Sequence, residues 1–279
     1  MTISQTVSFG LQEARQLLPK VTRQDNKSSR GRTLIIAGSA EFPGAGILAA
    51  RAALRSGSGY VLLAQHDPPF LSLEHPDFLM VDLDKHSLGE QHFDAAAIGP
   101  GCGVNEKTDR HLQSLFEMQV DRLVVDADAL TVMARNTNLE RRSTWILTPH
   151  EGEMSRLLNI PAEVIREDRA HWVREAQRLF GAIVLLKGHE TLIASETELV
   201  KIQAGNSALA KSGTGDVLTG IIASFLSQGL APMQAACLGA FAHGCTADLW
   251  VKGGRDPLSM MASDLIEFLP QTLFHIRES

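Results

Sequence analysis

The residues best suited to chemistry lie in the stretch 205–220, GNSALAKSGTGDVLTG. Gly213, Thr214 and Gly215 form a small-residue turn directly before Asp216, and an apolar run of helical character follows. Such a turn at a helix start points unpaired backbone N–H groups and the positive end of the helix dipole at one place, which suits phosphate oxygens. A carboxylate repels phosphate, so Asp216 fits there as a base that takes a proton from a hydroxyl about to receive a phosphoryl group. The alternative is that Asp216 only stabilises the helix N-terminus.

Three further motifs could meet a ligand through backbone groups or charge. Residues 99–103 (GPGCG) continue neither a strand nor a helix and allow close approach of a ligand, or else form a purely structural turn. Residues 44–46 (GAG) open a predicted helix with free N–H groups, and tight helix–sheet packing is the alternative. Lys187 ends a buried apolar run in the motif KGHET (187–191), where an ammonium group can meet phosphate.

A helix also begins within the motif TPHEGE (148–153). His150 lies at the carboxyl end of a predicted strand and is predicted to donate a hydrogen bond to the substrate. Glu153 is either a simple helix cap or orients water on a magnesium ion. Asp126 and Asp128 flank another strand end, where helix capping by Asp128 is sufficient explanation, and neither is predicted to be catalytic.

These residues must be positioned by the elements around them. Short apolar runs predict strands at 33–38, 60–64, 78–83, 95–99, 122–126, 145–148 and 182–187, and a hairpin at 191–195 and 198–202. Helical patterns occupy 11–18, 44–57, 106–118, 151–158, 163–180, 214–228, 231–251 and 262–275. Apolar strands alternating with helices predict an α/β fold with a largely parallel sheet covered on both faces. We expect a polar, irregular lead-in over 1–30 and one domain over 31–279.

The positions of the motifs along this sheet predict a single site. Ligands of open α/β sheets bind outside the carboxyl ends of the strands, and five of the predicted strands end in the unusual residues described above. Five such ends are hard to obtain from packing alone.

Composition limits the classes of function. The chain has 279 residues, of which 44% are hydrophobic and 21% charged, and a net charge of −6 disfavours nucleic-acid binding. Cys102, Cys237 and Cys245 show no metal-ligand spacing, no base can be paired with Cys102, and a reducing compartment is expected. No secretory signal or membrane span is apparent, so we expect a soluble cytoplasmic protein.

The motifs GSAEFPGAGILAARAALRSGSGYV, AIGPGCG, VVDADAL, LTPHEGEMSRLL, LLKGHETLIA and GNSALAKSGTGDVLTGIIASFL occur in this order over about residues 30–275. In combination they resemble the ADP-dependent NAD(P)H-hydrate dehydratase family of the ribokinase-like superfamily. The resemblance implies a three-layer α/β/α sandwich and repair of the (6S)-hydrates of NADH and NADPH. It also implies that the substrate hydroxyl is phosphorylated at the expense of ADP or ATP and then eliminated as phosphate, with Mg2+ present.

The resemblance assigns roles to particular residues. Asp216 would be the base, and the N–H groups of Gly213, Thr214 and Gly215 would stabilise the transferring phosphoryl group. The residues implied to contact the hydrate are Ala45, Gly103, His150 and Asp216. The residues implied to contact the nucleotide are Lys187, Gly188, His189, Glu190, Thr191 and Gly215. Glu153 corresponds to the acidic position associated with magnesium through water.

The chain departs from the family pattern at three places. Glu151 and Ser207 stand where proline is usual, and His189-Glu190 is bulkier than the usual pair, which bears on nucleotide preference. Residues 1–30 are too short for the epimerase domain that many members carry, so a separate epimerase is expected as pathway partner. The resemblance also suggests a homo-oligomer, for which a tetramer is expected.

Two other functions compete with the dehydratase. A kinase of a small hydroxylated metabolite could use the same fold and leave a stable phosphorylated product, but the ring of strand-end motifs better suits a large dinucleotide. A non-catalytic nucleotide-binding protein is the third hypothesis, and the presence of Asp216 argues against it.

Overall fold

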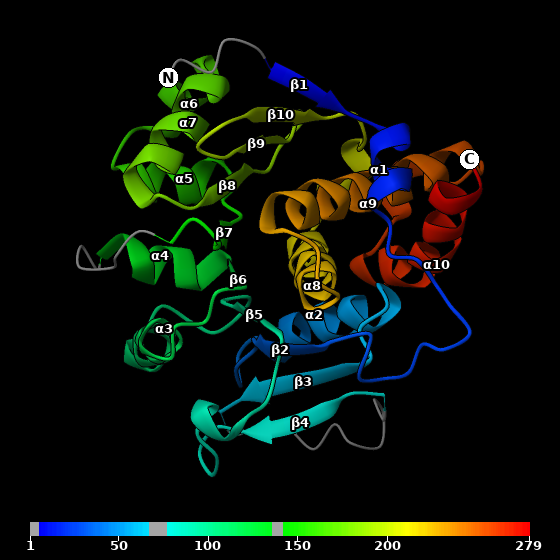
Figure 1. Ribbon diagram of the computed structural model, residues 1–279. Coiled ribbons are helices and arrows are strands. Elements are labelled where there is room, and N and C mark those ends of the chain that lie inside the picture. Colours follow the sequence, from blue (N-terminus) through cyan, green and yellow to red (C-terminus); the bar gives the residue numbers. More distant parts are fainter. Residues whose placement is uncertain (1–5, 67–76, 136–141) are drawn as a thin grey trace.

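The computed structural model describes residues 6–66, 77–135 and 142–279, and a ten-stranded sheet runs through them (Figure 1). The strands are β1 (Thr6–Phe9), β2 (Arg32–Ile36), β3 (Tyr60–Gln65), β4 (Leu79–Asp82), β5 (Ala95–Ile98), β6 (Leu123–Val125), β7 (Ile146–Leu147), β8 (Ile183–Leu186), β9 (Leu192–Ala194) and β10 (Leu199–Ile202). Their spatial order is β1-β10-β9-β8-β7-β6-β5-β2-β3-β4. Neighbouring strands are parallel except where β9 pairs with β8 and β10, so the predicted hairpin of β9 and β10 is confirmed.

Helices cover both faces of this sheet. They are α1 (Leu11–Leu17), α2 (Pro43–Arg55), α3 (Glu106–Glu117), α4 (Ala127–Arg135), α5 (Glu151–Leu158), α6 (Ala162–Glu167), α7 (Arg169–Phe180), α8 (Thr214–Ser227), α9 (Pro232–Lys252) and α10 (Ala262–Glu278). One buried cluster joins the sheet to α1, α2, α8, α9 and α10, and a second joins it to α3 through α7 (Figure 1). Alternate strand residues enter alternate clusters, as Ile35 and Leu34 do, because successive side chains of a strand point to opposite faces. The predicted three-layer α/β/α sandwich is confirmed.

Three local features differ from the prediction. β1 lies in the expected irregular lead-in and pairs with β10; only Phe9 of its four residues is buried, so it shows no alternation that could reveal an edge strand. α4 begins two residues after the end of β6 and was missed, because the single residue between them, Asp126, is too short a connection to show as a turn. The helix expected over 163–180 is broken at Asp168, whose extended backbone (φ −144°) ends α6 and whose side chain caps α7.

The packing of α2 against α8 positions the site. A Cβ on Gly220 of α8 would lie 2.1 Å from the carbonyl oxygen of Ala49 in α2, so only glycine permits this approach. A Cβ on Gly213 would lie 2.8 Å from Cδ1 of Leu48, which places the turn before α8 beside the first turns of α2. Both helix N-termini therefore lie near the carboxyl edge of the parallel strands. Within the described part of the chain, the helices are too short or too polar to cross a bilayer.

Candidate active site

The GTGD turn presents free backbone donors. Gly213 adopts the left-handed conformation (φ 89°) and precedes α8, whose first residue is Thr214. The Thr214 hydroxyl donates to the carbonyls of Leu209 and Lys211, at 2.9 Å each, so it holds the turn in shape and is not free for a ligand. The N–H groups of Gly215 and Asp216 have no hydrogen-bond partner among the described residues. Free N–H groups at the start of α8 are what the predicted anion site requires, and anion binding stays a prediction.

Asp216 is set up as a base near neutral pH. Its carboxylate makes no hydrogen bond within the described residues. Burial and, after it, the negative charge of Asp126 raise its pKa from 3.8 to about 7, although the positive charge of Lys187 opposes them. A carboxylate with this pKa can both exist as the base at neutral pH and hold an abstracted proton.

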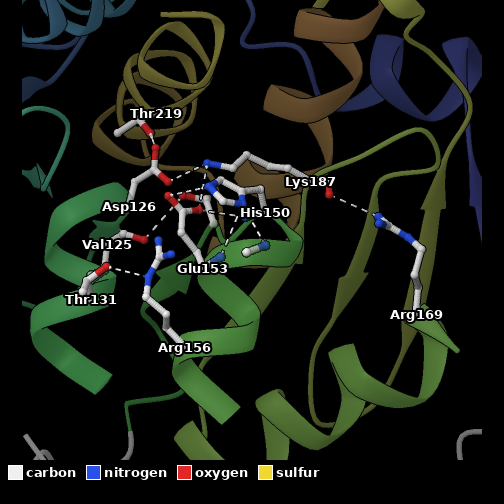
Figure 2. A network of polar contacts seen from close by, with 11 residues as sticks. Val125, Asp126, Thr131, His150, Glu153, Arg156, Arg169, Lys187 and Thr219 are labelled. Carbon is white, nitrogen blue, oxygen red and sulfur yellow. Dashed lines mark hydrogen bonds and ion pairs between the residues drawn. The ribbon is translucent and has the colours of Figure 1, made fainter. Parts of the chain in front are cut away.

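Lys187 lies beside the N-terminus of α8 in a network of buried charges (Figure 2). Its Nζ is 2.7 Å from Oδ1 of Asp126 and 3.6 Å from Oε2 of Glu153. Burial alone would lower the pKa of Lys187, but the charges of Asp126 and Glu153 outweigh it and raise the pKa. A Cβ on Gly215 would be 3.5 Å from the same Nζ. The ammonium group therefore lies next to the free N–H groups, where phosphate oxygens would bind.

Asp126 is the centre of this network and was missed as a site residue. It is 1% exposed, and its Oδ2 accepts a hydrogen bond of 2.6 Å from Thr219 of α8. His243 of α9 was also missed; its Nε2 lies 2.9 Å from the carbonyl oxygen of Thr214, and burial lowers its pKa to about 4. The position of Asp126 at a strand end was a usable signal for it. No sequence signal marked Thr219 or His243, which come into place only by helix packing.

His150 and Glu153 cap α5 reciprocally. Nδ1 of His150 accepts from the N–H groups of Gly152 and Glu153 at 2.9 and 3.3 Å, and Oε2 of Glu153 accepts from the His150 N–H at 2.8 Å. The capping interpretation of Glu153 is therefore confirmed, and its buried carboxylate faces Lys187 as well. The His150 side chain remains 54% exposed, and because Nδ1 is an acceptor the ring carries its donor on Nε2. Donation to a substrate stays a prediction.

Arg169 holds the KGHET loop in place. Its guanidinium Nη2 donates to the carbonyls of Leu186, Lys187 and Glu190 at 3.1–3.3 Å. Nη1 pairs with Glu151 (28% exposed), so this unusual carboxylate is directed to Arg169 and not left free beside a substrate. The network links the start of α5 to the loop after β8.

The remaining predicted residues of this loop point toward solvent. Gly188, His189 and Glu190 are exposed, and the Glu190 carboxylate pairs with Lys201 of β10. Thr191 is partly buried, and its hydroxyl lies 3.5 Å from the Gly188 carbonyl. The loop has accessible surface for a nucleotide, and that contact stays a prediction.

Two predicted substrate contacts lie at the other side of the GTGD turn. Ala45 is in the first turn of α2, next to Gly101 of the GPGCG motif. The N–H of Gly103 donates to Oδ2 of Asp128 at 2.8 Å, and its carbonyl accepts from Thr108 at 2.7 Å. Both backbone groups of Gly103 are therefore already used, and its closeness to a ligand stays a prediction.

The three cysteines do no chemistry at this site. Sγ of Cys102 donates to the Ile36 carbonyl, and burial raises its pKa to about 12, so no thiolate forms near neutral pH. Cys237 and Cys245 are buried free thiols. Ser207 is the first residue of a short 3-10 turn, and the hydrogen bonds of this turn do not use its backbone N–H. Proline and serine can therefore both occupy this position.

The residues present fit a magnesium ion held through phosphate and water. The charges of Asp126, Asp128, Glu153 and Asp216 all act on this site, against the single ammonium of Lys187. Within the described ranges no three histidine, cysteine or acidic side chains converge as direct ligands. Asp126 and Glu153 already accept hydrogen bonds, so an outer-shell role of Glu153 fits this donor set better than direct coordination.

An α/β/α sandwich with a GTGD turn and a free aspartate defines the ribokinase-like class of fold. A ribokinase-like protein of Enterococcus faecalis superimposes with a TM-score of 0.88 at 23% identity, covering 100% of this chain and 99% of that one. Hydroxyethylthiazole kinase of Pyrococcus horikoshii has a TM-score of 0.63 at 15% identity, covering 94% and 92%. These likenesses concern the fold.

Closer similarities identify the family. The family model of NAD(P)H-hydrate dehydratase matches residues 33–271, and the chain belongs to this family. It is 36% identical over 248 residues to the ADP-dependent (S)-NAD(P)H-hydrate dehydratase of Neisseria meningitidis, covering 86% of this chain and 84% of that protein. The crystal structure of the ADP/ATP-dependent NAD(P)H-hydrate dehydratase of Bacillus subtilis, co-crystallised with ATP and Mg2+, has a TM-score of 0.90 at 29% identity, covering 98% and 99%.

Some relatives are longer. The bifunctional NAD(P)H-hydrate repair enzyme Nnr of Moorella thermoacetica is 37% identical over 282 residues. The alignment covers 95% of this chain but 53% of that protein, so the chain spans about half the length of this bifunctional relative.

Proposed function

We propose that the protein dehydrates the (6S)-hydrates of NADH and NADPH at the expense of ADP or ATP. The observation that carries this proposal is Asp216, a carboxylate with a pKa of about 7 that makes no hydrogen bond to any described residue and is located beside free N–H groups and Lys187. Such a group accepts the hydroxyl proton while the adjacent cationic end of α8 holds the phosphoryl group. The names and similarity of the family members support the choice of substrate.

The reaction proceeds by activating a poor leaving group. Asp216 takes the proton of the substrate hydroxyl as its oxygen bonds to the terminal phosphorus of the nucleotide, and the bond from that phosphorus to the departing AMP or ADP breaks. The phosphate then leaves with the electrons of its carbon–oxygen bond, and the adjacent carbon gives up a proton to solvent water, so that the electrons of the C–H bond form the double bond of the reduced nicotinamide. Magnesium, when bound, supplies neutralisation of the phosphate charges.

The protein groups divide this work between two sides of Asp216. The N–H groups of Gly215 and Asp216, together with Lys187, stabilise the transferring phosphoryl group. The loop 187–191 binds the nucleotide, and Glu153 orients water around magnesium. Ala45, Gly103 and His150 line the side that receives the hydrate.

Three further features belong to this proposal. The three free cysteines support a reducing, cytoplasmic location. Leu258 and Met261, 78% and 56% exposed, support burial of this surface in a homo-oligomer, which we propose to be a tetramer. An NAD(P)H-hydrate epimerase is proposed as pathway partner.

The experiment mixes the purified protein with hydrated NADH or NADPH, Mg2+ and either ADP or ATP. Recovery of reduced-nicotinamide absorbance and release of phosphate in equal amounts are expected. Asp216→Asn should abolish both, whereas Asp264→Asn is a matched control because Asp264 is likewise the third residue of its helix. No recovery with either nucleotide would refute the proposed function. A stable phosphorylated product would assign a kinase instead.

A further inference from the structure

The loop that leads into α8, residues 204–213, is attached to α9 at its start. Oδ2 of Asp248 in α9 accepts the Gly205 N–H at 2.9 Å, and Oδ1 accepts from Nδ2 of Asn206 at 2.8 Å. A Cβ on Gly244, one turn earlier in α9, would lie 2.6 Å from the carbonyl oxygen of the first loop residue, so the helix and the loop backbone are in direct contact. The start of the loop therefore has a fixed position relative to α9.

The same helix also holds the residue at which the loop ends. Nε2 of His243 lies 2.9 Å from the carbonyl oxygen of Thr214, the first residue of α8. A carbonyl oxygen only accepts hydrogen bonds, so Nε2 carries the proton. Burial lowers the pKa of His243 to about 4 although this hydrogen bond raises it, so the ring is neutral near pH 7, where Asp216 titrates. His243 is therefore an uncharged donor at the pH of the reaction.

Hydrogen bonds within the loop connect its two attachments to α9. Oδ1 of Asn206 accepts the Ala208 N–H at 2.9 Å. The carbonyl of Leu209, the next residue, accepts from the Thr214 hydroxyl at 2.9 Å. The two ends of the loop are thus linked to each other as well as to α9.

The Thr214 carbonyl and the Gly215 N–H belong to one peptide unit. In a trans peptide the C=O and N–H bonds share a rigid plane and point in opposite directions. A hydrogen bond that holds the carbonyl toward His243 consequently directs the Gly215 N–H away from His243. That N–H has no partner among the described residues, and a Cβ on Gly215 would lie 3.5 Å from Nζ of Lys187. Because helix ends fray, this attachment keeps the free donor at one position.

We propose that His243 and Asp248 are positioning residues for phosphoryl transfer, which hold the Gly215 N–H in place for the charge that develops on the transferring group. The inference rests on the proposed function. Accepting a hydrogen bond at the carbonyl polarises an amide and strengthens its own N–H as a donor. Donors that are already in place stabilise transferring charge because they need no reorientation during the reaction. Both residues act through the loop and the peptide unit that precedes Gly215.

The test replaces His243 and measures kcat, KM and nucleotide binding separately, with hydrated NADH, ADP and Mg2+. His243→Leu keeps a side chain of similar size without a donor, and kcat should fall about 10-fold, less than for direct removal of an oxyanion donor. The Kd of ADP, measured by titration calorimetry, and KM for the hydrate should stay within about threefold of wild type, because the donor acts mainly in the transition state. His243→Gln places an amide N–H near the position of Nε2 and should restore kcat to within about threefold.

A control and a second variant separate positioning from general stability. Thr246 of α9 is 1% exposed and its hydroxyl donates to the Ala242 carbonyl of the same helix at 2.7 Å. Thr246→Val therefore loses a buried hydrogen bond without affecting the loop, and kcat should stay within about twofold of wild type. Asp248 is only partly buried, so Asp248→Ala should fold normally and lower kcat about 3- to 5-fold through the loop.

Three results would overturn the inference. They are a kcat of His243→Leu within about twofold of wild type, a glutamine variant no more active than the leucine variant, and a loss in Thr246→Val equal to that in His243→Leu. If His243→Leu does not fold, an unchanged kcat in Asp248→Ala overturns it. Wild-type protein that converts neither hydrate with either nucleotide would refute the proposed function itself, which separates the two failures.

Discussion

Replacing Asp216 with asparagine should stabilise the protein while removing its activity. Burial and the negative charge of Asp126 raise the pKa of Asp216 from 3.8 to about 7. At about 1.4 kcal/mol per pKa unit, ionised Asp216 costs the folded state at most about 4 kcal/mol above pH 7. Asparagine removes the charge but leaves an amide that must find hydrogen bonds, so a net gain of about 1–2 kcal/mol is expected.

The pH dependence of this gain identifies its cause. Because the folded-state pKa is raised, the cost is absent below about pH 4, increases as pH rises and is complete above pH 7. Thermal unfolding should therefore give Asp216→Asn a melting temperature about 3–6 °C above wild type at pH 8, and less than half that difference at pH 5. In the dehydratase assay, kcat should fall at least about 100-fold because the base is lost.

The control is again Asp264→Asn, since Asp264 accepts the Met261 N–H at 2.8 Å in an ordinary helix cap. That variant should lose about 0.5–1 kcal/mol at both pH values and keep its activity. If Asp216→Asn is no more stable than wild type at pH 8, or keeps more than a tenth of the turnover, the assignment of Asp216 as a destabilised base is wrong.

Three further predictions concern its neighbours. Asp126→Asn removes a negative charge that raises the pKa of Asp216. The decrease of kcat/KM on the acid side, which we expect near pH 7 in wild type, should therefore move to lower pH in a pH–rate profile. An unchanged profile would contradict the electrostatic coupling between Asp126 and Asp216. Arg169→Lys removes the guanidinium group that donates to three carbonyls at the end of β8 and in the loop after it. KM for ADP should rise about 5- to 20-fold with little change in KM for the hydrate, as measured by varying the concentration of each substrate separately. Gly220→Ala places a Cβ 2.1 Å from the Ala49 carbonyl, forces α2 and α8 apart and should cost about 1–3 kcal/mol by chemical denaturation; an unchanged denaturation midpoint would contradict this packing.

The local sequence was sufficient for the elements that carry strong periodicity. Buried parallel strands such as Leu123–Val125 and Ile183–Leu186 are continuous apolar runs, and helices such as α8 follow directly from a glycine turn. β1 was not predictable, because a four-residue edge strand with one buried residue has no distinctive pattern until β10 pairs with it. The break at Asp168 depends on two helices packing in different directions, which composition does not encode.

The sequence by itself determined the groups available at this site: a glycine turn suited to phosphate, a carboxylate beside it and a lysine at a strand end. The tertiary structure decided what those groups become. Lys187 is 28 residues before Gly215 and 61 after Asp126 in the chain, yet all three adjoin because parallel strands end at one edge of the sheet. Burial and the nearby charge of Asp126 turn Asp216 from a helix-start aspartate into a base with a pKa of about 7. A pKa depends on surrounding dielectric and charge, and these exist only when distant segments of the chain have come together.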